Sequence, residues 1–180
     1  MEYAFKWINS PVGALKLVAK DACLTAILWE QDSSRRVKLG NMLEDINNPV
    51  LLKAEQQLAE YFAGERTQFD MELDFQGTAF QREVWAALLT IPFGQTRSYS
   101  DIANQIKRPM AVRAVGAANG KNPISIIAPC HRVIGMSGEL TGFAGGLKAK
   151  EILLKLEGHN FPKQKIQKIS GFAPAQSSLF

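Results

Sequence analysis

The hydrophobic pattern of this chain changes character once, near residue 49, and the change restricts the folds open to it. Three short apolar stretches rich in strand-forming residues occupy positions 3–8, 14–19 and 23–29. From residue 49 onward the apolar residues recur mainly at helical spacing. Strands followed by helices predict an α/β (α+β) fold, with a small N-terminal sheet-plus-helix domain and a mainly helical C-terminal domain.

Composition divides the chain into three predicted parts. Its 180 residues are enough for one domain or two small ones. An acidic stretch at 65–77 predicts a linker, so we expect a strand-rich domain at 1–75, a second domain at 76–162 and a flexible basic tail at 163–180. The polar residues 31–48 have no clear period and fit either a short helix or a loop.

Helix signals mark most of the chain after residue 47. Asn48 followed by Pro49 is typical of a helix start, and residues 78–81 have the pattern of a capping box. Two short helices are expected at 100–106 and 110–119, joined by a tight turn beside basic residues. This arrangement fits a helix-turn-helix and equally an ordinary helical hairpin.

Several protein classes are excluded by composition. No run approaches the roughly 18 consecutive apolar residues of a membrane span, and the first residues resemble neither a secretory signal nor a transit peptide. The two cysteines, Cys23 and Cys130, are too few for a disulfide framework or a four-cysteine zinc site. We therefore expect a protein of the reducing cytoplasm.

Charge is distributed unevenly along the chain. Residues 1–75 carry 8 Lys/Arg and 12 Asp/Glu, whereas residues 76–180 carry 13 and 5, which gives formal charges of −4 and +8. A basic half predicts a surface that faces a polyanion such as nucleic acid. The alternative is that both halves are ordinary solvated surfaces.

The segment 129–133, Pro-Cys-His-Arg-Val, is the strongest candidate for chemistry. His131 and Arg132 beside Cys130 can favour the nucleophilic thiolate. Glu157, at the end of a predicted helix, can orient an imidazole and so complete a Cys-His-Glu relay. Neighbouring residues of a strand point to opposite faces, so this relay requires a bend in the backbone. The alternative is a buried, unreactive cysteine.

Two further segments have an unusual composition. Small residues dominate the helix expected at 110–119, where Arg113 is the only long charged side chain. Such a helix can approach a nucleic-acid groove or a packed neighbour, and Arg113 can enter a duplex or lie in solvent. The glycine-rich stretch 142–146 can wall a flat-ring pocket or form a plain surface loop, and no Gly-Lys-Ser/Thr follows that would cradle a phosphate.

A series of spaced motifs resembles the O6-alkylguanine-DNA alkyltransferases, also called methylated-DNA–protein-cysteine methyltransferases. The similarity covers about residues 75–160, and the first 75 residues resemble only the weaker strand-rich domain of that family. The motifs that carry the resemblance are PCHRV at 129–133, FQREVW at 80–85, IPFG at 91–94, SY at 98–99, RAVG at 113–116, NP at 122–123 and EGH at 157–159.

The resemblance implies direct repair of alkylated double-stranded DNA. A helix-turn-helix enters the minor groove, O6-alkylguanine rotates out of the stack, and its alkyl group passes to Cys130, which is not regenerated. His131 would take up the thiol proton through a water, Glu157 would orient His131, and Asn122 would link the helix-turn-helix to the site. No metal and no cofactor is implied. We expect a monomer that acts once per molecule, and the sequence leaves O4-alkylthymine open as a second substrate.

The same resemblance implies roles in handling the damaged nucleotide. Tyr99 would help rotate the nucleotide and donate its hydroxyl at the base, and Arg113 would fill the gap in the duplex. Small side chains such as Ala114 would let their helix sit deep in the groove. The implied base pocket consists of Val133, Phe143, Ala144 and Gly145.

The chain differs from the family's usual sequence at one residue of the implied base pocket, and two other functions stay open. Phe143 stands where the family commonly has tyrosine, so ring packing is kept and a hydroxyl contact to the base is lost. Some members have tryptophan instead of cysteine and only bind damage, and the four-cysteine module of fused regulators is missing here. Two alternatives stay open: a non-reactive protein that marks alkylated bases, and a cysteine hydrolase, against which Arg113 and the helix-turn-helix count.

The last five residues resemble the peptide by which bacterial repair proteins dock on the replication sliding clamp. Gln176, Leu179 and Phe180 would make that contact from a flexible tail. The alternative is a disordered end that happens to finish with two apolar residues.

Overall fold

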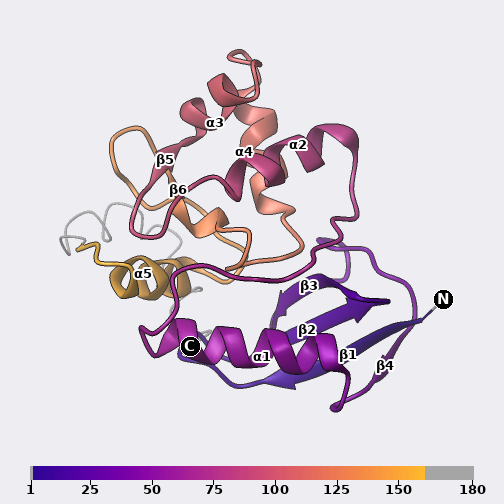
Figure 1. The fold of residues 1–180 in the computed structure, drawn as a ribbon. Helices are drawn as coiled ribbons and strands as arrows, with labels where there is room; N and C mark the ends of the chain where they lie inside the picture. Colours follow the sequence, from indigo (N-terminus) through magenta and orange to yellow (C-terminus); the bar gives the residue numbers. More distant parts are fainter. Residues whose placement is uncertain (1, 161–180) are drawn as a thin grey trace.

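Four strands of the first half form one mixed sheet in the order β3-β2-β1-β4 (Figure 1). The computed structural model describes residues 2–160. The strands are β1 (Tyr3–Ile8), β2 (Leu15–Lys20), β3 (Cys23–Trp29) and β4 (Met42–Glu44). The first three pair antiparallel in sequence order, whereas β4 joins β1 in parallel. Because side chains alternate along a strand, Leu15 and Leu17 belong to one face and Val18 to the other.

Helix α1 (Pro49–Phe62) packs on the face of the sheet that carries Leu17. Asn48 starts the helix as expected, because its Oδ1 accepts hydrogen bonds from the backbone N–H groups of Val50 and Leu51 at 3.0 and 3.2 Å. The side chains that α1 buries are Leu51, Ala54, Gln57, Leu58 and Tyr61.

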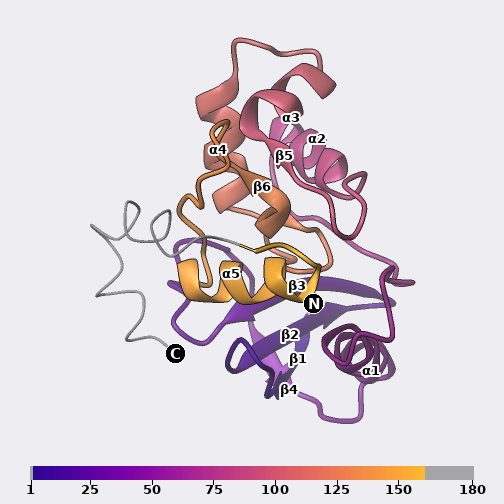
Figure 2. The ribbon, with the colours of Figure 1, turned by 90° about the vertical axis from the view of Figure 1, so that its left-hand side faces the viewer.

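The main hydrophobic core is shared by both halves of the chain. Leu17 and Ile27 of the sheet pack in one cluster with Leu153 of α5 (Leu147–Leu156) and with the apolar segment 124–127. The backbone N–H of Ile27 donates to the Pro123 carbonyl at 2.9 Å, which joins that segment to β3. Helix α5 therefore lies between the sheet and the helical part of the molecule (Figure 2).

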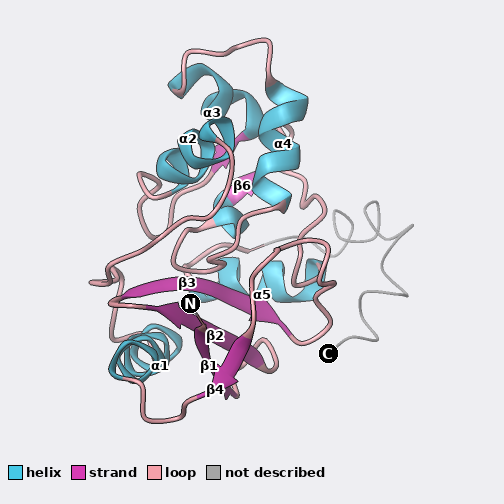
Figure 3. Ribbon diagram, turned by 90° about the vertical axis from the view of Figure 1, so that its right-hand side faces the viewer, coloured by secondary structure: helices cyan, strands magenta, loops and turns pink. Residues whose placement is uncertain are grey.

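The remaining helices form a second cluster on the far side of α5 (Figure 3). They are α2 (Ala79–Leu88), α3 (Tyr99–Gln105) and α4 (Val112–Gly120). Trp85 ties α2 to α4 by donating its Nε1–H to the Ala118 carbonyl at 2.8 Å. The parallel pair β5 (Arg97–Ser98) and β6 (Val133–Ile134) joins the start of α3 to the chain that follows the candidate cysteine.

The predicted fold class is confirmed, with local corrections. The capping box at 78–81 is present, and the two short helices run over 99–105 and 112–120 instead of 100–106 and 110–119. Within 31–48 the expectation of a helix or a plain loop missed the short strand β4, because its pairing with β1 is long-range and leaves no local pattern.

Some expectations concern parts or properties that the fold alone does not decide. The domain limits at residues 75 and 162 stay predictions, and the shared core shows that the two halves are built against each other. Residues 163–180 lie outside the described range. Within that range no helix is both long and apolar enough to cross a membrane.

Candidate active site

Cys130 lies at the start of a short 3-10 helix, η1 (Cys130–Arg132), which follows a fully buried segment. Asn122 shapes this segment, because its Nδ2 donates to the Ala128 carbonyl at 2.8 Å and its Oδ1 accepts the Ile124 N–H at 3.1 Å. The backbone bend that the Cys-His-Glu relay requires is therefore present, in the form of this 3-10 turn.

The Cys130 thiol is itself buried, with 3% of the residue exposed. Burial raises the pKa of this thiol, because a thiolate would lose its hydration. The Asn122 amide and the positive charges of Arg36 and Lys150 act against that rise. Arg132, expected from its position to favour the thiolate, instead points to Glu157. The resting group is the thiol, so its reactivity requires removal of a proton.

Glu157, which caps the C-terminus of α5, receives hydrogen bonds on both carboxylate oxygens. Its Oε2 accepts from Tyr61 Oη at 2.5 Å and from Arg132 Nη2 at 3.1 Å, and lies 2.7 Å from His131 Nε2. Its Oε1 accepts from Arg132 Nε at 2.7 Å and from the Gly94 N–H at 3.3 Å. We call Tyr61, His131, Arg132 and Glu157 the Glu157 hub.

The hub sets the protonation of the imidazole. Burial alone would raise the pKa of Glu157, but hydrogen bonds from His131, Arg132 and Tyr61 hold it far below its ordinary value. Burial lowers the pKa of His131, and the carboxylate only partly opposes this. Glu157 is thus ionised and His131 neutral at neutral pH, with the ring proton on Nε2, where it faces the carboxylate. His131 Nδ1 is then an unprotonated acceptor, and it is buried without a partner among residues 2–160.

Lys150 is a second charged group near the thiol that sequence reasoning missed. It lies on the buried side of α5, and its Nζ donates to the Val133 carbonyl at 2.7 Å. Burial lowers the pKa of Lys150 to about 8, against the influence of the Cys130 charge. Lys150 takes part in none of the ion pairs found within the described range.

Tyr99 stands at the junction of the thiol region and the helix pair. It is the first residue of α3, and its ring lies beside Gly116 of α4, where an added Cβ would be 3.8 Å away. The hydroxyl shares a hydrogen bond of 2.5 Å with Thr141 Oγ1. Burial raises the pKa of Tyr99, and the nearby charge of Cys130 adds to this, so the hydroxyl keeps its proton.

One side of α4 is left open to solvent. Arg113, Ala114 and Ala117 are exposed, whereas Val115 and Ala118 are buried against the other helices. Among these exposed side chains only that of Arg113 is long.

The predicted pocket residues lie against a tryptophan of the sheet. The Phe143 ring meets the Trp29 ring edge-on, with centroids 5.4 Å apart. A Cβ added to Gly145 would lie 2.7 Å from Trp29, so only glycine fits there without a shift. Trp29 is fixed in turn by its Nε1, which donates to Ser125 Oγ at 3.1 Å.

Two family models match the two halves of the chain. The family described as the DNA binding domain of 6-O-methylguanine DNA methyltransferase matches residues 79–159, and the one described as its ribonuclease-like domain matches residues 3–75. The chain therefore belongs to the methylated-DNA–protein-cysteine methyltransferase family. Its high-identity relatives carry that methyltransferase name and are DNA-binding repair enzymes.

Relatives and solved structures cover nearly the whole chain. The family member of Mycolicibacterium paratuberculosis is 50% identical over 159 residues, which span 88% of this chain and 94% of the relative. The member of Methanosarcina acetivorans is 46% identical over 158 residues, which span 88% and 99%. The crystal structure of the Mycobacterium tuberculosis O6-methylguanine methyltransferase has a TM-score of 0.79 at 50% identity and covers 89% of this chain and 95% of its own.

A structure of the same M. tuberculosis protein with DNA is also similar. It has a TM-score of 0.77 at 51% identity and covers 87% of this chain and 92% of its own.

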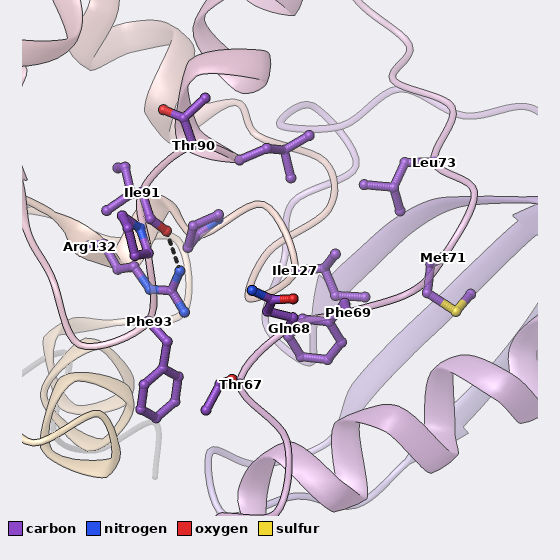
Figure 4. Close-up of a pocket in the computed structure, with 13 residues that line it drawn as sticks. Thr67, Gln68, Phe69, Met71, Leu73, Thr90, Ile91, Phe93, Ile127 and Arg132 are labelled. Atoms are coloured by element: carbon purple, nitrogen blue, oxygen red, sulfur yellow. Dashed lines mark hydrogen bonds between the residues drawn. The ribbon is translucent and has the colours of Figure 1, made fainter.

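A cleft of about 720 Å³ opens beside the Glu157 hub (Figure 4). Arg132 of the hub lines it, whereas Cys130 is not among its lining residues. The lining comes from the predicted linker, from the loop after α2 and from three residues between 127 and 132. The lining residues are Thr67, Gln68, Phe69, Met71, Leu73, Leu89, Thr90, Ile91, Pro92, Phe93, Ile127, Pro129 and Arg132.

The structure brings most of the predicted residues of this methyltransferase together. His131 and Glu157 are paired, and Asn122 holds the loop that ends at Cys130. Val133 follows η1 directly, and Tyr99 lies close enough for the Cys130 charge to contribute to the raised pKa of Tyr99. Arg113 and Ala114 lie apart from them on the open side of α4. Within residues 2–160 no group of three or more metal-binding side chains is gathered in one place.

Proposed function

We propose that this methyltransferase repairs DNA by transferring the alkyl group of O6-alkylguanine irreversibly to Cys130, once per molecule. The observation that carries the proposal is the Cys130 thiol beside a neutral His131 whose Nδ1 is unprotonated and unpartnered. In the transfer a sulfur–carbon bond forms, the carbon–oxygen bond breaks, and the electron pair stays on guanine.

The proposed proton path runs from the Cys130 thiol to the His131 imidazole of the hub. A water between Cys130 and His131 Nδ1 passes the thiol proton to the imidazole, which becomes a cation held by Glu157. General-base catalysis of this kind contributes about 10²–10⁴-fold. Tyr99, whose hydroxyl is protonated, donates a hydrogen bond to the displaced guanine. Asn122 and Lys150 stabilise the thiolate while it forms.

The proposed DNA-binding element is the open side of α4. Its small side chains let it enter the minor groove, and Arg113 occupies the space left by the rotated nucleotide. Rotation costs on the order of a few kcal/mol, and less where alkylation has weakened the base pair. Val133, Phe143, Ala144 and Gly145 then enclose the base, with Phe143 supplying a ring surface and no hydroxyl.

The proposed cellular setting follows from the same scheme. The protein acts as a monomer in the cytoplasm, and the acidic half of the chain faces away from DNA. Docking on a sliding clamp through Gln176, Leu179 and Phe180 stays a prediction, because these residues lie outside the described range. Binding of purified clamp to the full chain, but not to a chain ending at residue 175, would support it; equal binding would contradict it.

Mass spectrometry after incubation with an O6-methylguanine oligonucleotide tests the transfer. We expect a gain of one methyl group on Cys130, no gain in Cys130→Ala, and full transfer in Cys23→Ala, which removes the other free cysteine. Tight binding without a mass change would favour a protein that only marks damage. Loss of the methyl group from the protein with continued turnover would favour a hydrolase.

A further inference from the structure

Three donors from two distant parts of the chain converge on one oxygen atom of the site. Glu157 Oε2 accepts from Tyr61 Oη at 2.5 Å and from Arg132 Nη2 at 3.1 Å, and it is 2.7 Å from His131 Nε2. The carboxylate has no remaining freedom to rotate without losing a charge-assisted hydrogen bond. Two of the donors lie next to Cys130 in the chain, whereas Tyr61 lies 96 residues before Glu157.

Tyr61 reaches this position from the N-terminal half. It lies in the last turn of α1, is fully buried, and is surrounded by the rings of Phe62, Phe69 and Phe93 at centroid distances of 5.3, 5.5 and 6.2 Å. Phe69 and Phe93 also line the cleft beside the hub (Figure 4). Burial raises the pKa of Tyr61, and the Glu157 charge adds to this, so the hydroxyl is always a donor. The Tyr61 hydroxyl therefore donates its hydrogen bond to the Glu157 carboxylate.

We propose that Tyr61 is a positioning residue of the alkyl transfer: its hydroxyl fixes Glu157 Oε2 opposite His131 and so aims His131 Nδ1 at the thiol. The inference rests on the proposed role of Cys130 and His131. It gives the N-terminal half a part in the chemistry, because α1 supplies a group that the helical half lacks.

The charged and titratable groups around His131 determine the sign of the expected effect. They are Glu157 and Lys150 from α5, Arg132 and Cys130 from η1, and Tyr61 from α1. The Tyr61 hydroxyl draws negative charge away from Oε2, so the carboxylate attracts the His131 proton less strongly. Removal of the hydroxyl should raise the pKa of His131 and extend its protonated form to higher pH.

The variant Tyr61→Phe tests this role, because it keeps the ring and deletes the donor. The chain has only two histidines, so the imidazole signals of His131 can be followed by NMR in the full-length protein. We expect a higher His131 pKa, a single-turnover rate at saturating DNA lowered by about tenfold, and a shift of the acid limb of the rate profile to higher pH. Affinity for DNA should be unchanged.

Phe69→Leu is the matched control, since it disturbs the same aromatic cluster without touching Glu157. It should lower the melting temperature but leave the His131 titration and the transfer rate as in wild type. The inference is overturned if Tyr61→Phe leaves both quantities unchanged, or if Phe69→Leu reproduces its effects. If the wild type does not transfer methyl to Cys130, the proposed function fails, and the titration of His131 alone then decides whether Tyr61 positions the hub.

Discussion

The Glu157 hub and the open side of α4 are built on opposite principles. In the hub, residues from α1, η1 and the end of α5 meet in a buried site where both carboxylate oxygens accept hydrogen bonds. On α4, Arg113 and Ala114 face solvent, and within the described range Arg113 takes part in no hydrogen bond or ion pair. The Glu157 carboxylate already accepts hydrogen bonds on both oxygens before any substrate arrives, whereas Arg113 on α4 has no partner in the described range.

This contrast separates the two kinds of effect that a mutation can have. A change in the hub alters folding and chemistry together, because the same hydrogen bonds hold the core and orient His131. A change on the open side of α4 should leave the folded state almost untouched, and it should alter DNA binding if this side enters the groove as proposed. Measurements of unfolding and of transfer on the same variants therefore test whether the two regions respond differently.

The largest effect is expected for Glu157→Ala. It leaves the Arg132 guanidinium buried without its counter-ion and removes the acceptor of His131 and Tyr61. Breaking a buried pair from one side costs about 3–5 kcal/mol, which should appear as a lower free energy of unfolding in urea. Methyl transfer by the remaining folded fraction should fall by about 10²-fold or more. Loss of transfer with unchanged stability would show that the hub is not part of the folding core.

Acid should weaken the hub in two stages. The pKa of His131 is lower in the folded state than its ordinary 6.5, so the unfolded chain binds more protons, and stability is lost as pH falls below about 6.5. The pKa of Glu157 is also depressed, so its contribution is full above the ordinary 4.5 and is lost as pH falls further.

Urea unfolding between pH 8 and pH 4 checks this order. The variant His131→Gln should lose the first stage and keep the second, and Arg113→Ala should follow the wild-type curve throughout. A wild-type free energy of unfolding that is flat from pH 7 to pH 5 would contradict the assignment of a neutral, buried His131.

How far the site was predictable depends on whether its residues are adjacent in the chain. The capping box at 78–81 and the PCHRV segment are local signals. The relay of Cys130 with a histidine and Glu157 was proposed from the residue types, and the resemblance then implied it again for His131. The role of Tyr61 was not predicted, because a tyrosine on the apolar side of a helix has the pattern of a core residue. The carboxylate that its hydroxyl contacts lies 96 residues away in the chain. Arg36 escaped for a similar reason: it donates to the Asn122 carbonyl at 2.8 Å from a polar segment without any period.

The burial of Lys150, in contrast, is indicated by the local sequence of its helix. It lies at helical spacing from Leu147 and Leu154, both buried, so a lysine interrupts an apolar stripe. A charged residue within an apolar stripe indicates a charge that the fold must bury. The sequence does not tell which groups the Lys150 ammonium faces, because Val133 and Cys130 lie on another element of the fold.

Lys150→Met should have a smaller effect on stability than Glu157→Ala and a specific effect on the thiol. The apolar side chain fits a buried position, but the Val133 carbonyl loses its donor, at a cost of about 1–3 kcal/mol. Without the ammonium group the pKa of the Cys130 thiol should rise further. The pH dependence of iodoacetamide alkylation, measured in a Cys23→Ala background so that one thiol remains, gives this pKa. An unchanged alkylation profile would remove Lys150 from the thiol's electrostatic environment.

The smallest effect on folding is expected for Arg113→Ala. This variant therefore best separates an effect on transfer from duplex DNA from an effect on stability. An exposed residue without a partner in the described range should change the free energy of unfolding by no more than about 0.5 kcal/mol, and the His131 titration should be that of wild type. Transfer from duplex DNA should nevertheless slow, because the gap left by the rotated nucleotide is no longer filled, whereas transfer from the free base O6-methylguanine should be unaffected. Equal slowing with both substrates would mean that Arg113 acts on the thiol and that the two regions are coupled.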